Sequence, residues 1–432
     1  MTSKYSQEYD LTVLGATGYT GKLCVEYIAT SLPTNLRWAV AGRSESKLLA
    51  LIEELKAIHP DRKQPGKLSY WGPPCVILIA VTGVEITSLS LKDLGQLTRK
   101  TRVLINTIGP YHLYSTPVVE ACATNGTHYL DVTGESPWVL EMIRKYHETA
   151  KVNHAIIIPE IAIESAPSDL LTFALAKIIR EKLSVGTKEV IGCVHEVKGA
   201  PSGGTLATVL GLLDHYSLKE VAESSGTWAS SPVPGPKDIA SPSLLSKLIG
   251  IRYVEGLGTL TTSVSAGPNV ATVQRSWGLL DGGKLYGPRF SYHEYAAVRN
   301  AFIGIIIHFV VIFGALALAL APVRWLLRKV LYAPGQGATR EAANNDSIEY
   351  RAVATADQDG PNPQRAIGKM RWDGGNYYFT GVCLAEAAMV ILNEGELMER
   401  LDGGILTPAM LGQPFIDRMT KAGMAFEVEM MP

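Results

Sequence analysis

The stretch LTVLGATGYTG, residues 11–21, joins a short apolar run to three glycines, Gly15, Gly18 and Gly21. The apolar residues are typical of a strand, and a helical pattern follows over residues 20–31. A glycine turn between a strand and a helix lets the backbone approach a pyrophosphate, which the open N–H groups of the helix then bind. An ordinary structural loop is the alternative, but the position of the turn favours a dinucleotide site. The candidate phosphate-binding residues are Gly15, Ala16, Thr17, Gly18, Tyr19, Thr20 and Gly21.

The same alternation of strand and helix continues to about residue 160. Runs of apolar and β-branched residues predict six strands, and helical periodicity fills the segments between them. This pattern predicts an α/β fold whose first domain, residues 1–160, is a doubly wound, dinucleotide-binding Rossmann domain. The predicted strands cover residues 9–14, 36–41, 75–81, 102–108, 127–132 and 154–159.

The second strand indicates which dinucleotide is bound. An NAD site carries an acidic residue at the end of this strand, where it binds the ribose 2′-hydroxyl. This chain has Arg43 and Ser44 there instead, with Lys47 one turn later. A guanidinium beside a hydroxyl suits a 2′-phosphate, so the sequence favours NADP(H). A solvated helix start, with Ser44 as the N-cap, is the alternative.

The strand at residues 102–108 ends in a polar turn. Ligands of doubly wound sheets bind beyond the carboxyl ends of the strands, so this turn is expected beside the nicotinamide. Tyr111 and His112 follow it and are the candidate proton donors, although a Gly-Pro turn with a buried tyrosine explains Tyr111 equally well. The candidate cofactor residues of this turn are Asn106, Thr107, Gly109 and Pro110.

Residues 161–299 and 338–432 are predicted to form a second α/β (α+β) domain for substrate binding or dimerisation. Its expected strands include residues 190–197, 347–356, 365–372 and 377–380. A Gly-Gly-Thr sequence opens one of its helices, where backbone N–H groups can bind a carboxylate or phosphate, with a simple turn and cap as the alternative. The candidate substrate residues are Ser168, Gly203, Gly204 and Thr205.

A hydrophobic segment, residues 300–337, interrupts this second domain. Residues 301–321 carry no charge and are long enough to span about 30 Å of hydrocarbon. The segment is predicted to associate with a membrane or lipid droplet as a helical hairpin turning at Pro322. A buried helix is the alternative. If the strands before and after it share one sheet, both its ends lie on one side of the membrane, and a single span is excluded.

The composition of the chain argues against several classes of function. The 432 residues carry 40 basic and 41 acidic side chains, so the balance gives no electrostatic case for nucleic-acid binding. The five cysteines form no C-x-x-C pair, which argues against a metal site or a disulfide framework. The polar first ten residues show no signal peptide, so the expected location is the cytoplasmic face of a membrane or droplet.

Several motifs together resemble the saccharopine dehydrogenase-like oxidoreductases, which include lipid-droplet-associated members and trans-acting enoyl reductases. The motifs are GATGYTG at 15–21, AGRS at 41–44, NTIGPY at 106–111, NGTHYLDVTGE at 125–135, SAPSDL at 165–170, SGGTLAT at 202–208 and GGILTPA at 403–409. The resemblance implies a Rossmann domain, a second domain split around the hydrophobic segment, and a nicotinamide cofactor. It places dinucleotide contacts at Gly15, Thr17, Gly18, Tyr19, Thr20, Arg43, Asn106 and Gly109. The loop at 160–165 departs from the family pattern and is expected to border the substrate.

The predicted function is an NADPH-dependent oxidoreductase that reduces the C=C bond of an enoyl group. The substrate is expected to be hydrophobic, either a small molecule of lipid, polyketide or terpenoid type or a carrier-bound acyl group. Reduction of a C=O or C=N bond is one alternative, and a non-catalytic NADP-binding scaffold on a lipid surface is another. No tyrosine begins a Y-x-x-x-K motif, so short-chain dehydrogenase chemistry is not supported. The sequence leaves open whether the chain forms a homodimer.

Overall fold

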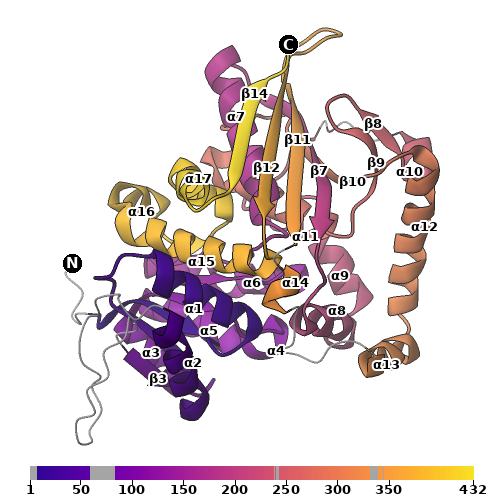
Figure 1. The fold of residues 1–432 in the computed structure, drawn as a ribbon. Coiled ribbons are helices and arrows are strands. Elements are labelled where there is room, and N and C mark those ends of the chain that lie inside the picture. The colour runs from indigo at the N-terminus through magenta and orange to yellow at the C-terminus, as the bar shows by residue number, and fades with distance from the viewer. Residues whose placement is uncertain (1–6, 59–82, 238, 240–242, 331–338, 344) are drawn as a thin grey trace, which may run out of the picture. The chain divides into compact units, whose positions relative to one another are not determined.

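The computed structural model describes residues 7–58, 83–237, 239, 243–330, 339–343 and 345–432. The chain divides into two compact units. Unit 1 consists of Met1–Thr133, Glu141–Ala162 and Tyr377–Leu406. Unit 2 consists of Gly134–Leu140, Ile163–Asn376 and Thr407–Pro432. Each unit has its own sheet, as Figure 1 shows.

Unit 1 is built on a parallel sheet with the strand order β13-β6-β5-β4-β1-β2-β3. Its central strands are buried, as expected for a parallel sheet with helices on its faces; Leu11 and Val13 of β1 are 0% exposed. This is the predicted Rossmann sheet. Its strands are β1 (Tyr9–Leu14), β2 (Trp38–Gly42), β3 (Gly83–Ile86), β4 (Thr101–Asn106), β5 (His128–Asp131), β6 (Ile156–Ile158) and β13 (Gly404–Ile405).

Helices connect the strands of unit 1, so that most of its parallel pairs are joined by crossovers (Figure 1). They are α1 (Tyr19–Ser31), α2 (Glu45–Ile58), α3 (Leu91–Lys100), α4 (Tyr111–Tyr114), α5 (Thr116–Asn125), most of α6 (Ser136–Val152), α15 (Asn376–Asn393) and α16 (Gly395–Leu401). The strand predicted at 75–81 lies outside the described residues. In the described part of the chain, β3 is the strand that pairs with β2 on the side away from β1.

The structure differs from the predicted domain boundary near the C-terminus. Tyr377–Leu406 belongs to unit 1, although residues 338–432 were all assigned to the second domain. The strand β13 adds to the sheet edge beside β6, with Gly404 opposite Ile156. This pairing is non-local and involves a strand of only two residues, so no periodicity in the sequence could indicate it.

The strand prediction for residues 377–380 is wrong, because these residues begin helix α15. Their aromatic side chains favour a strand locally, but they pack instead against α1. Tyr377 meets Tyr19 edge-on with ring centroids 5.2 Å apart, and Tyr27 donates a hydrogen bond to Glu386 at 2.6 Å. A Cβ on Gly381 would lie 2.8 Å from the Cys24 backbone N, so the two helices approach closely. Tertiary packing overrides the local β propensity here.

Unit 2 contains a mixed sheet with the strand order β14-β12-β11-β7-β10-β9-β8. Strands β7 and β10 are parallel, and the other neighbours are antiparallel. The strands are β7 (Thr187–Lys198), β8 (Arg252–Val254), β9 (Gly258–Thr262), β10 (Ser291–Ala297), β11 (Ser347–Ala356), β12 (Arg365–Asp373) and β14 (Ala425–Met430). The second α/β domain of the prediction is therefore present as a second sheet with its own helices.

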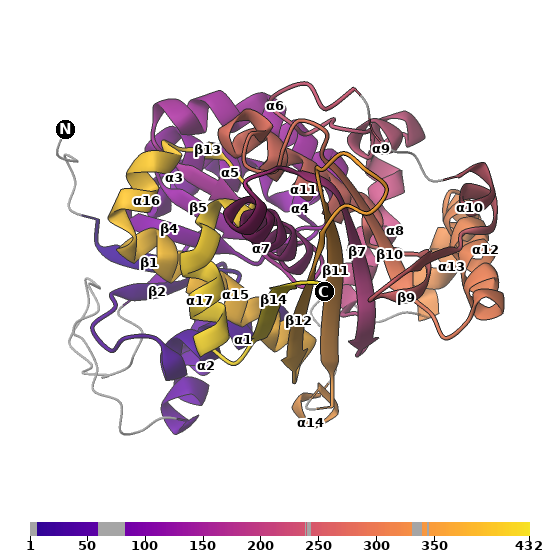
Figure 2. The same cartoon turned by 90° about the horizontal axis from the view of Figure 1, so that it is seen from above.

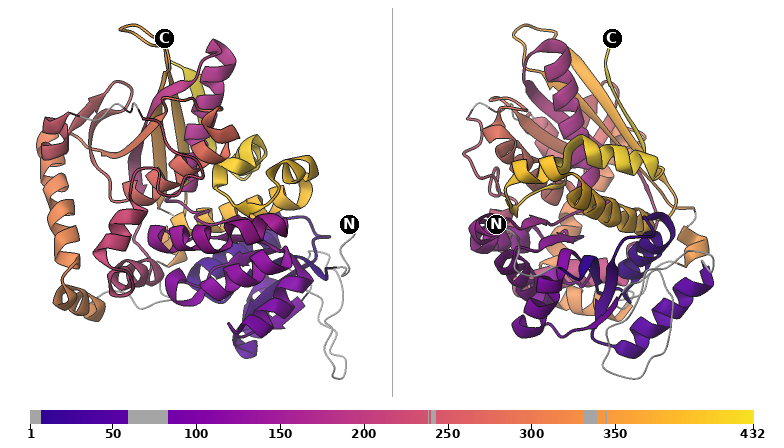
Figure 3. Two further views of the ribbon diagram at one scale, coloured as in Figure 1. Left: turned by 180° about the vertical axis from the view of Figure 1, so that it is seen from behind. Right: turned by 90° about the vertical axis from the view of Figure 1, so that its left-hand side faces the viewer.

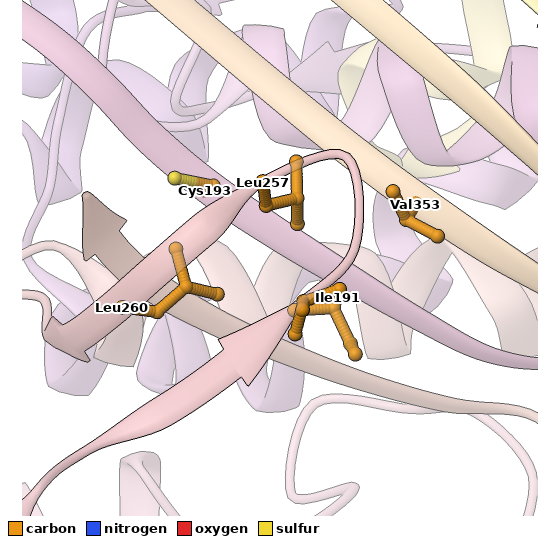
Figure 4. Packing of buried hydrophobic residues seen from close by; sticks show 6 residues of the cluster. Ile191, Cys193, Leu257, Leu260 and Val353 are labelled. Carbon is orange, nitrogen blue, oxygen red and sulfur yellow. The ribbon is translucent and has the colours of Figure 1, made fainter.

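Helix α7 crosses one face of this sheet, as Figure 2 shows, and α11 packs on both α7 and β10. On the sheet, Ile191, Cys193, Leu257, Leu260 and Val353 form a buried apolar cluster (Figure 4). The helices of unit 2 are α7 (Ala166–Leu183), α8 (Gly203–His215), α9 (Leu218–Ser224), α10 (Leu244–Ile249), α11 (Ala266–Leu279), α12 (Ala301–Leu318), α13 (Ala321–Val330), α14 (Arg340–Ala343) and α17 (Gly412–Lys421), with 3-10 turns at Asp281–Gly283 and Pro408–Leu411.

The hydrophobic segment forms α12 and then α13, which lie at one edge of unit 2 (Figures 1 and 3). Of the described helices, α12 alone is long and apolar enough to cross a membrane, yet only 11% of its residues are buried. Gly304 and His308 rest on β9: Thr261 Oγ1 donates to the Gly304 carbonyl at 2.7 Å, and Thr262 Oγ1 lies 2.7 Å from His308 Nδ1. The alternative of a buried core helix is therefore wrong, since most of α12 is exposed.

The two ends of the hydrophobic segment return to one sheet. Strand β10 precedes α12 and β11 follows α13, and both strands pair with β7. Helix α13 has ten residues, about 15 Å of helix, which is too short to recross a bilayer. Because the strands before and after the segment share one sheet, both ends of the segment lie on the same side of any membrane, and a single span is excluded. The geometry of α12 is that of a helix that lies at a surface.

A buried carboxyl ties the C-terminal segment into unit 2. Asp169 on α7 accepts hydrogen bonds from Ser276 Oγ at 2.6 Å and from the Ala409 N–H at 2.7 Å. Ser276 Oγ also lies 2.6 Å from Thr407 Oγ1. Burial raises the pKa of Asp169 to about 7 despite these donors.

This pKa predicts how stability depends on pH. The folded pKa lies above the unfolded value, so the native state holds the Asp169 proton more tightly. The contribution of Asp169 to the free energy of unfolding therefore falls as pH rises from about 4 to about 7. Urea unfolding at about pH 5 and about pH 8 should show a larger loss of stability for the wild type than for Asp169→Asn, which does not titrate. Equal losses in the two proteins would contradict the assignment.

Candidate functional site

The turn after β1 has the geometry that a pyrophosphate site requires. Gly15 has φ +84°, in the left-handed region that favours glycine. A Cβ on Gly15 would lie 2.8 Å from Ile108 Cγ1, and a Cβ on Gly21 would lie 2.3 Å from the Gly15 carbonyl oxygen. The turn is therefore closed so tightly against α1 that both positions need glycine.

The N-terminus of α1 is open at this turn. Gly18 is the N-cap, and as a glycine it provides no side-chain cap for the helix. The first N–H groups of an α-helix have no acceptor in the preceding turn of that helix, and at this end of α1 they suit an anion. Thr17 and Ala16 complete the loop. These residues fit the phosphates of a dinucleotide.

The end of β2 carries positive charge. Arg43 and Lys47 are exposed, and among the described residues neither forms an ion pair or a hydrogen bond. Ser44 opens α2, with its carbonyl accepting from Leu48 N at 3.1 Å, and its hydroxyl lies 3.3 Å from Ser46 Oγ. Ser44 thus lies at the N-cap position before Glu45, as the alternative interpretation of this residue predicts. Among the described residues, the Arg43 side chain stays available for a 2′-phosphate.

The end of β4 is held by a buried asparagine. Asn106 is 0% exposed; its Nδ2 donates to Ser115 Oγ at 2.8 Å and to Tyr129 Oη at 3.0 Å, and its Oδ1 accepts from Ile108 N at 3.1 Å. Both polar atoms of its side chain thus form hydrogen bonds that shape the turn. Thr107 Oγ1 donates to the Leu14 carbonyl at 3.1 Å, which joins this turn to the end of β1.

The proposed proton donors lie in α4, directly after the cis Gly109-Pro110 bond. The Tyr111 hydroxyl donates to the Asn106 carbonyl at 3.2 Å and accepts from the Val132 N–H at 3.4 Å. Tyr111 is 5% exposed and His112 is 7% exposed. The contacts of Tyr111 join the ends of β4 and β5 and give it a structural role, while catalysis by Tyr111 or His112 stays a prediction.

The predicted cofactor residues meet at one edge of the unit 1 sheet. They follow the carboxyl ends of β1, β2 and β4, which are neighbours in the order β4-β1-β2. A dinucleotide that lies across this edge can contact the phosphate turn, Arg43 and the turn after β4 together. The glycine cradle and the available guanidinium fit an NADP nucleotide.

The predicted substrate residues lie in unit 2. The Ser168 hydroxyl donates to Glu294 Oε2 at 2.7 Å, so it is part of a buried polar cluster. Gly203, Gly204 and Thr205 form the first turn of α8, where Ser202 Oγ accepts from the Thr205 N–H at 3.4 Å. This contact is the helix cap that the alternative interpretation predicts. A substrate role for Ser168, Gly203, Gly204 and Thr205 stays a prediction.

The polar cluster around Glu294 was not found from the sequence. Glu294 on β10 is 5% exposed and accepts hydrogen bonds from five side chains of unit 2. Glu294 also lines a cavity of about 250 Å³, together with apolar side chains including Trp228, Ile239 and Val270. The donors are Ser168, Ser263, Ser265, Asn269 and Tyr292. Their spacing along the chain gives no local signal, because three separate elements bring them together.

Comparison with known families agrees with this geometry. The family model described as the saccharopine dehydrogenase NADP binding domain matches residues 11–158. This range covers the phosphate turn, Arg43 and the turn after β4. The chain is therefore an NADP-binding oxidoreductase whose first unit is a Rossmann domain.

Similar proteins extend the match to nearly the whole chain. A Mycobacterium tuberculosis protein, provisionally named a trans-acting enoyl reductase, is 30% identical over 98% of this chain and 97% of its own length. The saccharopine dehydrogenase-like oxidoreductase of Bos taurus is 26% identical over 97% of each chain. The chain belongs to the saccharopine dehydrogenase-like oxidoreductase family. A lipid droplet localized protein of Caenorhabditis elegans is 33% identical over 38% of this chain and 35% of its own.

Among solved structures, the saccharopine dehydrogenase of Saccharomyces cerevisiae shares the fold. It aligns with a TM-score of 0.55 over 98% of this chain and 100% of its own, at 10% identity. This likeness supports the two-sheet architecture and carries no information about the substrate.

Proposed function

We propose that the chain is an NADPH-dependent enoyl reductase that acts on a lipid-like, polyketide or terpenoid-type substrate. The observation that carries the proposal is the NADP site at the carboxyl edge of the unit 1 sheet, in a chain that matches a protein named as an enoyl reductase over nearly its full length. The apolar cavity of unit 2 and the exposed α12 suit a hydrophobic substrate, either free or carrier-bound.

The residues of the chain have three tasks in this reaction. The glycine turn and the N-terminus of α1 bind the pyrophosphate, and Arg43 binds the 2′-phosphate. The turn at residues 107–110 positions the nicotinamide end. NADPH, when bound, supplies a hydride for the β-carbon of the enoyl group. An acid must then protonate the α-carbon of the resulting enolate.

The direct test is consumption of NADPH by the purified full-length chain. Turnover with trans-2-enoyl thioesters, together with recovery of the saturated thioester, supports the proposal. Turnover only with ketones would favour C=O reduction, and turnover only with imines formed from amines and keto acids would favour C=N reduction. Tight binding of NADPH without turnover of any of these substrates would favour a non-catalytic scaffold.

The role of Arg43 predicts a difference between the two nucleotides. Arg43→Ala should weaken NADPH binding by about 10- to 100-fold, since hydrogen bonds to a charged group contribute about 1.5–3 kcal/mol. NADH binding should change little, because NADH has no 2′-phosphate. Isothermal titration with both nucleotides measures this difference. Arg400→Ala, which removes an exposed arginine of α16, is the control and should bind both as the wild type does. Equal losses for both nucleotides would contradict the 2′-phosphate assignment.

We also propose that the chain works at the cytoplasmic face of a membrane or lipid droplet. Leu244, Leu245 and Leu248 of α10 are exposed, and the last turn of α10 adjoins α12, since a Cβ on Gly250 would meet the His308 ring. We call the exposed apolar side chains of α10, α12 and α13 the α12 surface. Arg328 and Lys329 at the end of α13 place positive charge beside it, which suits anionic headgroups.

A further inference from the structure

The cavity of unit 2 that Glu294 lines lies at the edge of strand β10. Five consecutive residues of this strand, 291–295, line the cavity. Successive side chains of a strand point to opposite faces of the sheet, so a cavity on one face would contact only alternate side chains. A cavity that all five residues line therefore lies beside the edge of the strand, where its main-chain groups point.

This edge of β10 has no neighbouring strand over residues 291–294 in the described part of the chain. Strand β7 pairs with the opposite edge of β10, whereas β9 pairs with this edge only from Tyr295 onward. The Val298 N–H donates to the Thr259 carbonyl at 3.0 Å, in register with the β9 pairing. Because main-chain groups alternate in direction along a strand, the N–H and carbonyl of Tyr292 also point to the β9 side. They face the cavity, and no described strand pairs with them there.

Helix α11 forms a second wall of the cavity. Ala266, Val270 and Gln274 line it, and their spacing of four residues places them on one face of the helix. Gln274 is 5% exposed, and its Oε1 accepts a hydrogen bond from the Trp228 N–H at 2.6 Å. This bond determines which end of the side-chain amide carries the donor. No described residue accepts a hydrogen bond from Gln274 Nε2, yet this atom is not fully enclosed by protein, so it is a donor available to a ligand.

Trp228 completes the wall beside Gln274. Its backbone has φ +64°, a left-handed conformation that a bulky residue rarely adopts. Its indole ring packs on Trp277 with ring centroids 4.7 Å apart, and its N–H is held by Gln274. Strained conformations of this kind persist where the surrounding structure enforces them, and they are frequent at ligand sites. The cavity thus has a fixed apolar surface next to the Gln274 donor.

The polar groups of the two walls suit a secondary amide. The Tyr292 carbonyl on β10 needs a donor, and Gln274 Nε2 on α11 needs an acceptor. The N–H and the carbonyl of a planar trans amide point in opposite directions, so one amide can bridge the two walls. Its N–H pairs with β10 in the way that an extended peptide adds to the edge of a sheet. A cavity of about 150 Å³ holds a benzene ring, so one of about 250 Å³ holds roughly ten non-hydrogen atoms.

The same cavity disfavours charged ligands. Among the described residues that line it there is neither lysine nor arginine, so a carboxylate would be buried beside Glu294 without a countercharge. An ammonium group is also disfavoured. A carboxylate has about four positions for accepting hydrogen bonds, and Glu294 already accepts from five side chains. The ligand is therefore expected to be neutral.

We propose that the cavity at the β10 edge binds a small neutral molecule that carries a secondary amide on an apolar chain. The amide N–H donates to the Tyr292 carbonyl, and the amide carbonyl accepts from Gln274 Nε2. The apolar chain packs on Trp228 and Val270. The inference goes beyond the proposed function, because every group of this site belongs to unit 2 and the site requires neither NADPH nor an enoyl group.

The first experiment titrates the full chain with three probes of similar size. N-butylbutanamide should bind at least about 10-fold more tightly than butyl butanoate, because the ester lacks the N–H and leaves the Tyr292 carbonyl unpaired. Octanoate, which brings a carboxylate to Glu294, should bind at least about 10-fold more weakly than the amide. Isothermal titration measures all three. No binding of the amide, or equal affinity for the amide and either other probe, would overturn the proposal.

Two substitutions test whether the amide binds in this cavity. Gln274→Glu keeps an acceptor for the Trp228 N–H but replaces the donor with an acceptor, so amide affinity should fall by at least about 10-fold. Val270→Phe fills the cavity without removing these hydrogen bonds and should abolish binding. The controls are Gln364→Glu, at an exposed glutamine before β12, and Val209→Phe, at a 48% exposed valine of α8. Both should bind the amide as the wild type does.

Thermal unfolding shows whether each variant is folded. Val270 is only partly buried, so Val270→Phe should keep the thermal midpoint of the wild type even if Gln274→Glu lowers it. Wild-type amide affinity in folded Val270→Phe would overturn the assignment of the ligand to this cavity.

A fourth probe distinguishes a small amide from a peptide segment. N-acetylvaline methylamide carries two peptide amides and a branched side chain, so it should bind more weakly than N-butylbutanamide in a cavity of this volume. Tighter binding would overturn the small-molecule assignment in favour of a peptide. None of these titrations contains NADPH or an enoyl group. Failure of the amide to bind therefore leaves the proposed reduction intact, and failure of the reduction leaves the amide site intact.

Discussion

Gly21→Ala is expected to abolish measurable NADPH binding, with a loss of at least about 100-fold in affinity. The added Cβ would lie 2.3 Å from the Gly15 carbonyl oxygen and 2.8 Å from Thr107 Oγ1. Neither the backbone oxygen nor the short threonine side chain can move away without opening the turn. Because overpacking of this kind costs about 1–3 kcal/mol, α1 should shift, so that its N–H groups no longer point at the phosphates.

The matched control is Gly395→Ala in unit 1. A Cβ at Gly395 meets no atom within 4 Å, and this residue begins α16. The Gly395→Ala variant should bind NADPH as the wild type does and should be slightly more stable, because alanine favours helix over glycine by about 1 kcal/mol. Fluorescence titration with NADPH and thermal unfolding measure both effects. Wild-type affinity in Gly21→Ala would show that this turn does not bind the cofactor.

The nucleotide site could be predicted from the sequence because its determinants are local. Gly15 and Gly21 lie within one strand–turn–helix unit, and Arg43 lies at the end of the next strand. Parallel strands joined by right-handed crossovers bring such turns to one edge of the sheet without further information. The NADP preference follows from charge at one position, and the family match at 11–158 confirms it.

The substrate side could not be predicted in the same way. Glu294 lies on β10, and apart from Tyr292 of the same strand its donors come from α7, α11 and the residues before α11, which are far from Glu294 in the sequence. No periodic pattern marks such a cluster, and a lone glutamate in a strand is more often solvent-exposed. For Asn106, the sequence predicts the position of the residue but not the role of its side chain. The sequence places it correctly at the end of β4, but only the structure shows that its side chain is fully used within unit 1.

The pairing of β11 with β7 changes the interpretation of the hydrophobic segment. The sequence left open whether residues 301–321 cross a bilayer, because length and composition are the same for a span and for a surface helix. Since β10 and β11 pair with opposite edges of β7, the chain leaves and re-enters one sheet around α12. Contacts of Gly304 and His308 with β9 hold one side of α12 on the protein. Most of the other residues of α12 are exposed and apolar, which is typical of a surface that binds lipid or another protein.

Loss of two exposed phenylalanines from α12 is expected to release the protein from lipid. Phe302 is 73% exposed and Phe313 is 63% exposed, near opposite ends of the helix. Burying one such side chain in hydrocarbon contributes about 1.5–3 kcal/mol, so Phe302→Ser with Phe313→Ser should weaken binding by about 100-fold or more. Flotation with phosphatidylcholine and phosphatidylserine vesicles, and with droplets that have a triacylglycerol core, measures the loss. Stronger binding to the droplets would favour a monolayer as the natural surface.

The same pair of substitutions distinguishes lipid binding from self-association. Both side chains are exposed, so the thermal midpoint of the double variant should match that of the wild type. Val152→Ser removes an exposed apolar side chain of α6, 75% exposed in unit 1, and should bind vesicles as the wild type does. If the double variant floats as the wild type does but becomes monomeric where the wild type is a dimer, α12 pairs with a second copy of the chain and the lipid proposal fails. If it stays in the soluble fraction with an unchanged oligomeric state, the α12 surface binds lipid, and the positive charge of Arg328 and Lys329 should then make binding weaken as salt rises.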